Sequence, residues 1–390
     1  MAGLYIHIPF CKSRCIYCGF YSTTSLAERE KYVDALCREM ELRPAQEALG
    51  GDAPICTIYL GGGTPSLLTR EQLLKLFRGI EKSYGESLLH KHSLEQEMEI
   101  TMECNPDDVT EEFCETLRML PINRISMGAQ TFDENRLCFL HRRHQASEVA
   151  TAVARLRNIG IKNISIDLMF GFPQETLSQW QQDLDAAISL GVEHISAYSL
   201  MYEEGTPLYK LLEKGKVAEI DEETSRLMYD TLIQRLTSAG YEHYEISNFA
   251  LPGYRSRHNS SYWHEEPYIG IGAAAHSYHR GKEVKRSWNI ANLHEYCKKI
   301  ETEGSATEDY EILDINTQYN DIIATALRTC DGIDIEHMRK EFGHSKVCTL
   351  LHEADKIIKR GLLQLKDGHL SLTREGLYIS DDVMSDLVLV

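Results

Sequence analysis

Short apolar runs of strand length alternate with longer amphipathic segments over the first 250 residues. Runs rich in β-branched and aromatic residues predict strands, and apolar positions three to four residues apart predict helices. The predicted strands are Leu4–Ile8, Thr57–Leu60, Glu99–Glu103, Arg124–Met127, Ser165–Met169, His194–Ser199 and Tyr241–Ser247. The predicted helices between them cover about residues 27–47, 70–84, 110–119, 145–158, 176–190 and 222–238. Such alternation predicts parallel strands joined by right-handed crossovers.

Six or so strand–helix units are fewer than the eight of a complete barrel, so we expect an α/β fold with a partial (β/α)6 barrel over residues 1–250. Residues 251–288 are rich in Gly, Tyr, Trp and His, and they predict a loop-rich linking segment. Over residues 289–390 we expect a smaller helical, winged-helix-like domain. Its predicted elements are helices at 289–303, 315–329, 333–342 and 346–360, then a hairpin of Leu362–Leu365 and His369–Leu372 around the turn Asp367-Gly368.

The composition is that of an ordinary globular protein, with 43% hydrophobic and 26% charged residues. Asp and Glu number 59 against 41 Lys and Arg, and the net charge of -18 argues against a nucleic-acid partner. No apolar run reaches the length of a membrane helix, and no secretion signal precedes the first predicted strand. The 11 cysteines show no disulfide-like spacing, so we expect a reducing, cytoplasmic location.

Cys11, Cys15 and Cys18 follow the first predicted strand in the run C-K-S-R-C-I-Y-C. Three unrelated thiols are the simplest alternative, because reduced cysteines are common in protein cores. However, a zinc site and an ordinary ferredoxin cluster each take four protein ligands. Three thiolates on one tight loop suit a [4Fe–4S] cluster with one open iron. The spacing therefore predicts a metal centre that can bind a small molecule.

Glycine and polar residues follow the next predicted strands. The run Gly61–Pro65 (G-G-G-T-P) lacks the ending of a phosphate-binding loop, and taken alone it predicts only a tight turn. Glu103, Gln130, Arg142 and Asp167 come from different strand–helix units, and each alone is more often a capping or ion-pair residue. Because the carboxyl ends of parallel strands meet on one side of a barrel, we expect them to converge. There the carboxylates could hold ribose hydroxyls, and Arg142 a carboxylate.

A further motif, R-H-N-S-S-Y-W, occupies Arg257–Trp263 in the predicted linking segment. His and Trp in a loop are more often structural than ligating. Neutral imidazole is nevertheless a standard ligand of haem iron, and Tyr or Trp rings pack on porphyrin faces. The motif is therefore a candidate haem site. The run Gly270–His276 after it predicts another tight turn.

Together these motifs resemble the radical S-adenosylmethionine (SAM) superfamily. More narrowly, the chain resembles the group that contains the oxygen-independent coproporphyrinogen III oxidases and the radical SAM haem chaperones. The likeness runs from Leu4 to the C-terminus and rests on Y-I-H-I-P-F-C, G-G-G-T-P-S, E-C-N-P, S-M-G-A-Q-T-F, I-D-L-M-F-G-F-P and H-N-S-S-Y-W. It implies a radical SAM barrel with a [4Fe–4S] cluster and a SAM site.

The resemblance also implies a role for each matching residue. Cys11, Cys15 and Cys18 would hold the cluster, and SAM would bind the open iron through its amino and carboxylate groups. Reduction by an electron donor would cleave SAM to methionine and a 5′-deoxyadenosyl radical. The residues that would line the SAM site are Tyr5, Tyr17, Gly62, Gly63, Thr64, Glu103, Gln130, Arg142 and Asp167. Those that would bind haem are His258, Asn259, Tyr262 and Trp263. No catalytic residue is assigned.

Three features favour the chaperone branch of this group. Phe20 stands where the oxidases carry a further cysteine, the oxidases' N-terminal extension does not precede the cluster loop, and the H-N-x-x-Y-W motif is intact. Gly19 departs from the chaperone pattern, which has Asp there, and matches the oxidases. We therefore expect a protein that binds haem and delivers it to haemoproteins such as membrane respiratory cytochromes. The alternative is an oxidase that decarboxylates coproporphyrinogen III to protoporphyrinogen IX.

Overall fold

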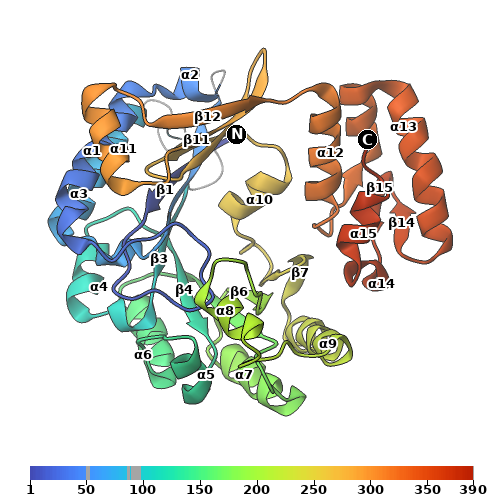
Figure 1. Cartoon of the computed structure of the whole chain (residues 1–390), viewed down its shortest axis with the longest axis horizontal. Helices are drawn as coiled ribbons and strands as arrows, with labels where there is room; N and C mark the ends of the chain where they lie inside the picture. The colour runs from blue at the N-terminus through green and yellow to red at the C-terminus, as the bar shows by residue number, and fades with distance from the viewer. Residues whose placement is uncertain (50–52, 86–87, 89–97, 390) are drawn as a thin grey trace.

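A mixed β-sheet forms the centre of the molecule. In a computed structural model, which describes residues 1–49, 53–85, 88 and 98–389, this sheet has 12 strands in the order β12-β11-β10-β9-β1-β2-β3-β4-β5-β6-β8-β7. The sheet curves, with helices along its outer side and a separate helical domain beyond α10 (Figure 1). Since β12 and β7 stand at opposite ends of the order, the barrel is open.

The first six strands pair in parallel in chain order, as the sequence predicts. They are β1 (Ala2–Ile8), β2 (Ile55–Gly62), β3 (Glu99–Cys104), β4 (Arg124–Gln130), β5 (Asn163–Phe170) and β6 (His194–Ser199). The helices of this region are α1 (Arg29–Leu42), α2 (Ala45–Leu49), α3 (Arg70–Tyr84), α4 (Glu111–Leu117), α5 (Glu134–Phe139), α6 (Ala146–Asn158), α7 (Leu177–Ser189), α8 (Pro207–Glu213) and α9 (Glu222–Ser238). The predicted α/β partial barrel is thus confirmed.

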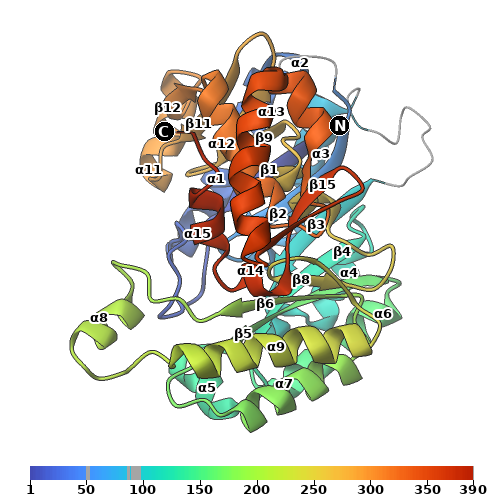
Figure 2. The same ribbon diagram turned by 90° about the vertical axis from the view of Figure 1, so that its right-hand side faces the viewer.

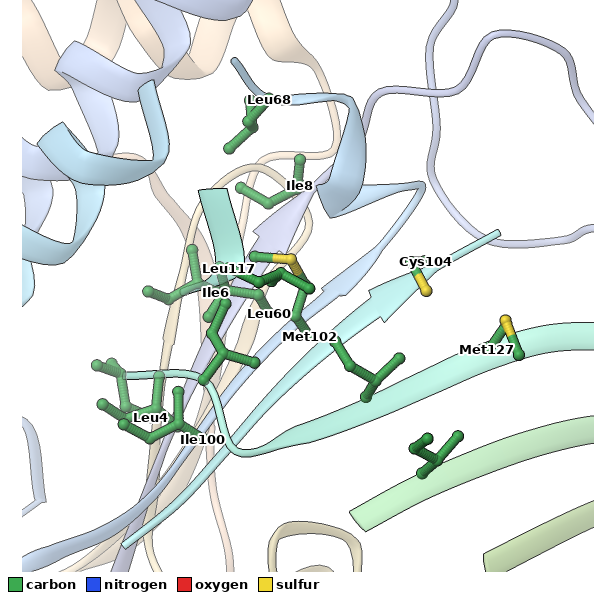
Figure 3. Packing of buried hydrophobic residues seen from close by; sticks show 14 of the residues in the cluster. Leu4, Ile6, Ile8, Leu60, Leu68, Ile100, Met102, Cys104, Leu117 and Met127 are labelled. Atoms are coloured by element: carbon green, nitrogen blue, oxygen red, sulfur yellow. The ribbon is translucent and has the colours of Figure 1, made fainter. Parts of the chain in front are cut away.

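The two faces of the parallel strands differ in chemistry. Leu4, Ile6 and Ile8 of β1 are fully buried, and they pack with apolar side chains of the next strands, such as Met102 and Met127 (Figure 3). Side chains alternate between the faces of a strand, so the residues between these point to the inner face. Those inner residues are largely polar, and they include Tyr59, Thr101, Glu103, Arg124, Ser126, Ser165, Asp167, His194 and Ser196. The apolar side chains therefore form the core on one face of the sheet, and the polar side chains between them point to the inner face.

The prediction of a loop-rich linking segment over residues 251–288 is wrong. This part of the chain forms α10 (Arg257–Trp263), β9 (Tyr268–Ile271), β10 (His276–Arg280) and most of β11 (Val284–Asn289), and α11 (Leu293–Thr302) and β12 (Thr307–Ile312) follow. β9 pairs in parallel with β1, and β10, β11 and β12 extend the sheet in antiparallel fashion. β9 pairs with a segment far away in the sequence, which local patterns do not reveal, whereas β10, β11 and β12 pair with strands near them in the chain.

The predicted strand Tyr241–Ser247 also differs from expectation. It forms β7 (Glu242–Glu245), which pairs in antiparallel fashion with β8 (Asn248–Ala250), and β8 in turn runs antiparallel to β6. The chain reverses immediately after β7, and a two-residue connection can join only antiparallel strands. This segment therefore closes the parallel series and adds no further strand–helix unit.

The C-terminal domain has its own hydrophobic core, which begins at Tyr319. It contains α12 (Ile315–Ala326), β13 (Ile333–Asp334), α13 (Ile335–Lys359), β14 (Leu363–Lys366), β15 (His369–Leu372), α14 (Arg374–Leu377) and α15 (Ser380–Ser385), and it faces the viewer in Figure 2. The core of the barrel extends to Ala306. The predicted boundary at residue 289 therefore lies too early, because it falls at the end of a strand of the barrel sheet.

Two predicted helices of this domain, 333–342 and 346–360, form the two parts of α13. Gly343 separates them with a φ of 82°, a value that glycine adopts without strain. The predicted hairpin is confirmed as β14 and β15. No helix within the described ranges has the length and apolar character needed to cross a membrane.

Candidate functional site

The loops at the carboxyl ends of β1 to β5 surround a cavity of about 190 Å³. The three cysteines of the first loop line this cavity. Eight of the nine predicted SAM-site residues line it as well: Tyr17, Gly62, Gly63, Thr64, Glu103, Gln130, Arg142 and Asp167. The parallel arrangement thus brings together residues that are far apart in the sequence.

The cysteine loop is held in place by backbone hydrogen bonds. Cys11 N donates to Thr23 O over 2.9 Å, and Cys18 N donates to Cys15 O over 3.3 Å. In the described part of the chain, no group of three or more His, Cys, Asp or Glu side chains is arranged around one metal ion. A [4Fe–4S] cluster, by contrast, takes each thiolate on a different iron. Three thiols around one cavity therefore fit such a cluster better than they fit a single zinc ion.

The surroundings of two of the thiols favour the neutral form in the metal-free protein. Burial raises the pKa of the Cys11 and Cys18 thiols above its ordinary value, and metal ligation removes such protons. The hydroxyl of Thr64 donates to Cys11 Sγ over 3.8 Å, and Arg142 Nη1 donates to Cys15 Sγ over 3.5 Å. A hydroxyl donor and a guanidinium both stabilise thiolates.

The glycine run packs directly against the base of the cysteine loop. Gly63 N donates to Ile8 O over 2.8 Å, and a Cβ atom at Gly63 would lie 2.7 Å from Phe10 O. Gly62 has a φ of 109°, and a Cβ atom there would collide with the His7 ring. A side chain at Gly63 would displace the start of the cysteine loop, and one at Gly62 would displace His7. The glycines therefore allow the second strand end to approach the cluster site closely.

Two buried carboxyl groups face the same cavity. Glu103 accepts hydrogen bonds from the Tyr59 hydroxyl at Oε1 (2.8 Å) and from Gly62 N at Oε2 (3.0 Å). Burial raises the pKa of Glu103 to about 7 and the pKa of Asp167 to about 6. Hydrogen bonds from Ser196 and Ser126 act in the opposite direction on Asp167. Buried carboxyl groups with such pKa values can accept hydrogen bonds from the hydroxyls of a ligand.

Backbone strain marks the end of β4. The strand register shifts between Gly128 and Gln130, and Gln130 has a φ of 68°. His141, which also lines the cavity, has a φ of 61°. Non-glycine residues in this conformation are concentrated at ligand sites, and bulges redirect side chains there. The bulge thus accounts for the position of Gln130 in the cavity wall.

One predicted residue lies outside the cavity wall, and several others were missed. The hydroxyl of Tyr5 lies 2.9 Å from His7 Nδ1, and its ring stacks on Tyr59 at 6.2 Å. Tyr5 therefore supports the residue that holds Glu103 and does not line the cavity itself. Sequence reasoning missed Asn105 and Ser126, which do line it. The sequence could have identified both residues, because Asn105 belongs to the E-C-N-P motif and Ser126 precedes Gln130 on the same strand.

The predicted haem motif lies on helix α10, and its histidine is buried in the protein interior. His258 is 1% exposed, and its ring stacks on Tyr59 at 5.1 Å. His258 Nδ1 lies 2.8 Å from Thr57 Oγ1, and His258 Nε2 lies 2.8 Å from the Tyr262 hydroxyl. Burial lowers the pKa of His258 to about 3, so the ring is neutral. The structure therefore does not present this imidazole on a surface.

A second cavity, of about 490 Å³, lies beside α10. Its wall includes residues of α10, of β7 and of the segment after α12. Trp263 lines it, whereas His258, Asn259 and Tyr262 do not. The four predicted haem contacts are thus not brought together in one cavity.

Comparison with known proteins places this chain in a family. Residues 5–187 match the radical SAM superfamily, and residues 313–379 match the HemN C-terminal domain. The chain is 33% identical to "Heme chaperone HemW" of Bacillus subtilis over 384 residues, which cover 98% of both chains. It is 32% identical to "Heme chaperone HemW" of Lactococcus lactis over 386 residues, which cover 99% of this chain and 97% of that protein.

Among solved structures, coproporphyrinogen III oxidase (HemN) from Escherichia coli superposes with a TM-score of 0.81 over 99% of this chain and 90% of that chain. At 20% identity this likeness concerns the fold alone. Membership of the radical SAM superfamily implies a [4Fe–4S] cluster and SAM, and the cavity at the strand ends has the residues to hold both. The resemblance predicted from the motifs is confirmed: the chain belongs to the HemW family of the radical SAM superfamily.

Proposed function

We propose that this protein is a haem chaperone, which binds haem and transfers it to acceptor haemoproteins. The observation that supports this proposal is the full-length similarity to two proteins named "Heme chaperone HemW". Acceptors that suit this role are respiratory cytochromes of the membrane. The 11 cysteines are all unpaired in the structure, which agrees with activity in the reducing cytoplasm.

We assign the cluster and SAM to the cavity at the strand ends. Cys11, Cys15 and Cys18 would hold the [4Fe–4S] cluster, which, when reduced by a donor, supplies the electron for SAM cleavage. The residues with direct roles toward SAM are Tyr17, Gly62, Gly63, Thr64, Glu103, Gln130, Arg142 and Asp167. Among these, Glu103 and Asp167 would accept hydrogen bonds from hydroxyl groups. Tyr5 would act one step away, through Tyr59.

We assign haem to the region of α10, with Trp263 as an aromatic contact. Trp263 Nε1 is buried and donates to no acceptor among the described residues. An unpaired buried donor in a cavity wall is suited to a polar group of a ligand. Asn259 and Tyr262 lie on the same short helix and would hold the haem in position.

Haem binding and transfer can be tested on the purified full-length chain. Addition of haem is expected to produce a shifted Soret band that saturates, and addition of an apo-cytochrome should move that band to the acceptor. A Trp263→Ala variant should weaken binding, while a Trp288→Ala variant, which alters a tryptophan outside this cavity, should not. A titration identical to that of free haem in buffer would contradict the proposal.

A second candidate function is oxygen-independent coproporphyrinogen III oxidation, favoured by Gly19. Gly19 matches the oxidase pattern at this position, and a Cβ atom there would meet only the carboxylate end of the exposed Glu203 side chain, which can move aside. The test is anaerobic incubation of the reconstituted protein with SAM, a reductant and coproporphyrinogen III. Sustained formation of protoporphyrinogen IX would establish the oxidase and contradict a purely carrier role. The absence of product alongside haem transfer would support the chaperone.

A further inference from the structure

We propose that His344 and Cys348 form a binding site for an exchangeable zinc-like metal ion on the surface of the C-terminal domain. Both residues lie in the second part of α13, after the break at Gly343. The Sγ atom of Cys348 lies 3.3 Å from Nε2 of His344. This site is separate from the cluster cavity, and it does not depend on the proposed haem chaperone function.

The spacing of the two residues brings their side chains together. His344 and Cys348 are four residues apart, and residues at this spacing lie on the same face of a helix, one turn apart. Another face of the same turns carries Val347, Leu350 and Ala354, which are buried in the core of the C-terminal domain. Because that apolar face anchors the helix, the imidazole and the thiol are held side by side at the surface.

The distance between the two side-chain atoms fits one tetrahedral ion. Zinc binds cysteine sulfur at about 2.3 Å and histidine nitrogen at about 2.0–2.1 Å, which places the two donor atoms about 3.6 Å apart at the tetrahedral angle. Nε2 of His344 and Sγ of Cys348 already lie 3.3 Å apart. A small rotation about the side-chain bonds is enough to close this difference. The helix therefore presents a preformed pair of metal ligands.

The exposure of the pair decides what kind of metal site it forms. His344 and Cys348 are both exposed, so water can fill the remaining positions of a bound ion. In the described part of the chain, no third His, Cys, Asp or Glu completes a set around one ion. Structural zinc sites have four protein ligands, and sites with fewer keep open positions. The ion would therefore exchange with solvent and accept ligands from another molecule.

The chemistry of the two ligands selects the class of ion. Thiolate and imidazole suit zinc and copper, whereas oxygen ligands suit magnesium and calcium. Binding replaces the hydrogen bond between the two side chains. The Cys348 thiol gives its proton to solvent and forms a sulfur–metal bond, and neutral His344 binds through the lone pair of Nε2. About one proton is therefore released for each divalent ion bound.

The lysine nearest to the pair in the sequence is directed elsewhere. Lys346 lies two residues from each ligand, and residues two apart do not face each other on a helix. Its ammonium donates to Asn316 Oδ1 and lies 5.9 Å from the centre of the Tyr319 ring. This charge is thus held on another side of α13 and does not compete with a bound ion.

The other exposed thiols lack this arrangement. Cys138 and Cys330 are exposed as well, but within the described ranges neither thiol contacts an imidazole. Sγ of Cys330 lies 3.6 Å from Asp331 Oδ1 and 3.7 Å from the guanidinium of Arg255, and a fixed cation beside the sulfur opposes a metal ion. Among these exposed thiols, Cys348 is therefore the one that can share an ion with a histidine.

The test is metal titration of the reconstituted full-length protein, in which the cluster would occupy Cys11, Cys15 and Cys18. Zn²⁺ added with a competing indicator chelator should show one site for each chain and release about one proton for each ion. Co²⁺ in place of Zn²⁺ should give a sulfur-to-metal band in the difference spectrum. Cys348→Ser should lose this band. Cys348→Ser and His344→Ala should each weaken Zn²⁺ binding at least about tenfold, because loss of even an outer partner of a metal ligand costs about 10–100-fold.

Matched controls change the same residue types elsewhere on the surface. Cys138→Ala removes an exposed thiol of α5, and His369→Ala removes an exposed histidine of the C-terminal domain. Both should keep the parental Zn²⁺ affinity. His352→Ala tests the exposed histidine four residues after Cys348 and should keep that affinity too. Because all the altered side chains are exposed, the variants should fold like the parent chain, which circular dichroism checks.

Each outcome decides the inference. Absence of the site in the parent chain overturns it, and so does parental affinity in either Cys348→Ser or His344→Ala. Loss of the site in His352→Ala or in another control would assign the ion to different residues and would overturn the inference as well. Loss in Cys348→Ser and His344→Ala, with binding kept in the three controls, supports the pair as the site. Haem titration of the same variants should match the parent chain, so failure of the metal site is distinguishable from failure of the proposed function.

Discussion

The guanidinium of Arg142 donates to the thiol of Cys15 over 3.5 Å and so connects the loop after α5 to the cysteine loop. Its Nη2 donates to Asn105 Oδ1 (2.6 Å) and to Gly128 O (2.5 Å), at the ends of β3 and β4. One side chain therefore joins the proposed cluster loop to two strands of the barrel. A buried cation beside a thiol also stabilises its thiolate.

Replacement of Arg142 by Ala should impair both the cluster and the fold. The change removes a cation beside Cys15 and the donor of two part-buried oxygens in the cavity wall, Asn105 Oδ1 and Gly128 O. Loss of a hydrogen bond typically costs about 0.5–1.5 kcal/mol. We expect a lower iron content after reconstitution, weaker SAM binding in equilibrium titrations, and a lower free energy of unfolding in urea.

A suitable control for that variant is Arg157→Ala, which removes an arginine of α6 that bonds Gly191 O and Glu193 far from the cysteine loop. It should retain parental iron content and SAM affinity. Parental iron content and SAM affinity in Arg142→Ala would show that the Arg142–Cys15 contact has no part in the site.

Replacement of Cys15 by Ala should abolish the cluster. Cys15 and two other thiols line one cavity, and loss of one of three ligands leaves an incomplete set. We expect the broad visible absorption of the reconstituted protein and its bound iron to be lost. Cys348→Ala removes an exposed thiol of the C-terminal domain and should leave both unchanged. A full cluster in Cys15→Ala would contradict the assignment of this loop.

Local sequence patterns were sufficient for the parallel strands and for most of the cluster cavity. Strands β1 to β6 have apolar residues on one face and polar residues on the other, and their carboxyl ends meet by the rule for parallel sheets. Residues such as Glu103 and Asp167, on different strands, could therefore be assigned to one site from the sequence alone. The bulge that turns Gln130 into that site comes from strand register, which a sequence pattern does not specify.

The surroundings of α10 could not be predicted in this way. His258 is buried because it meets Thr57, which lies 201 residues earlier in the chain, and because β9 joins the sheet beside β1. Both facts depend on contacts between distant segments. The motif match predicted a haem site at Arg257–Trp263 but did not reveal that His258 is buried.

The stability of the ligand-free protein should fall as pH rises from about 4.5 to about 7, in part because of Glu103. Burial raises the pKa of this carboxyl to about 7 from an ordinary value of 4.5, so the folded state binds a proton that the unfolded state releases over this range. Glu103→Gln removes the titrating group, and the variant should be more stable than the parent at pH 8 by up to about 3 kcal/mol. Urea unfolding at several pH values measures this difference.

For that experiment, Glu112→Gln on the exposed side of α4 is the control, and its pH profile should match the parental profile. An unchanged profile for Glu103→Gln would mean that its carboxyl does not carry a raised pKa in the folded protein.

Glu39 should be the carboxylate on which the added strands β9 to β11 most depend. Its Oε2 accepts from Gly272 N (2.9 Å) and from the Tyr296 hydroxyl (2.6 Å), and its Oε1 accepts from Asn289 Nδ2 (2.7 Å) and Arg43 Nη1 (3.0 Å). Glu39→Ala leaves Gly272 N and the Tyr296 hydroxyl without this acceptor, and each unpaired buried group costs about 1–3 kcal/mol. Arg43 keeps Gly270 O and Ser277 Oγ as acceptors. Glu41→Ala, on the exposed side of α1, removes only surface pairs and should cost less than about 1 kcal/mol. Equal urea midpoints for the two variants would contradict the idea that Glu39 ties α1 to this part of the sheet.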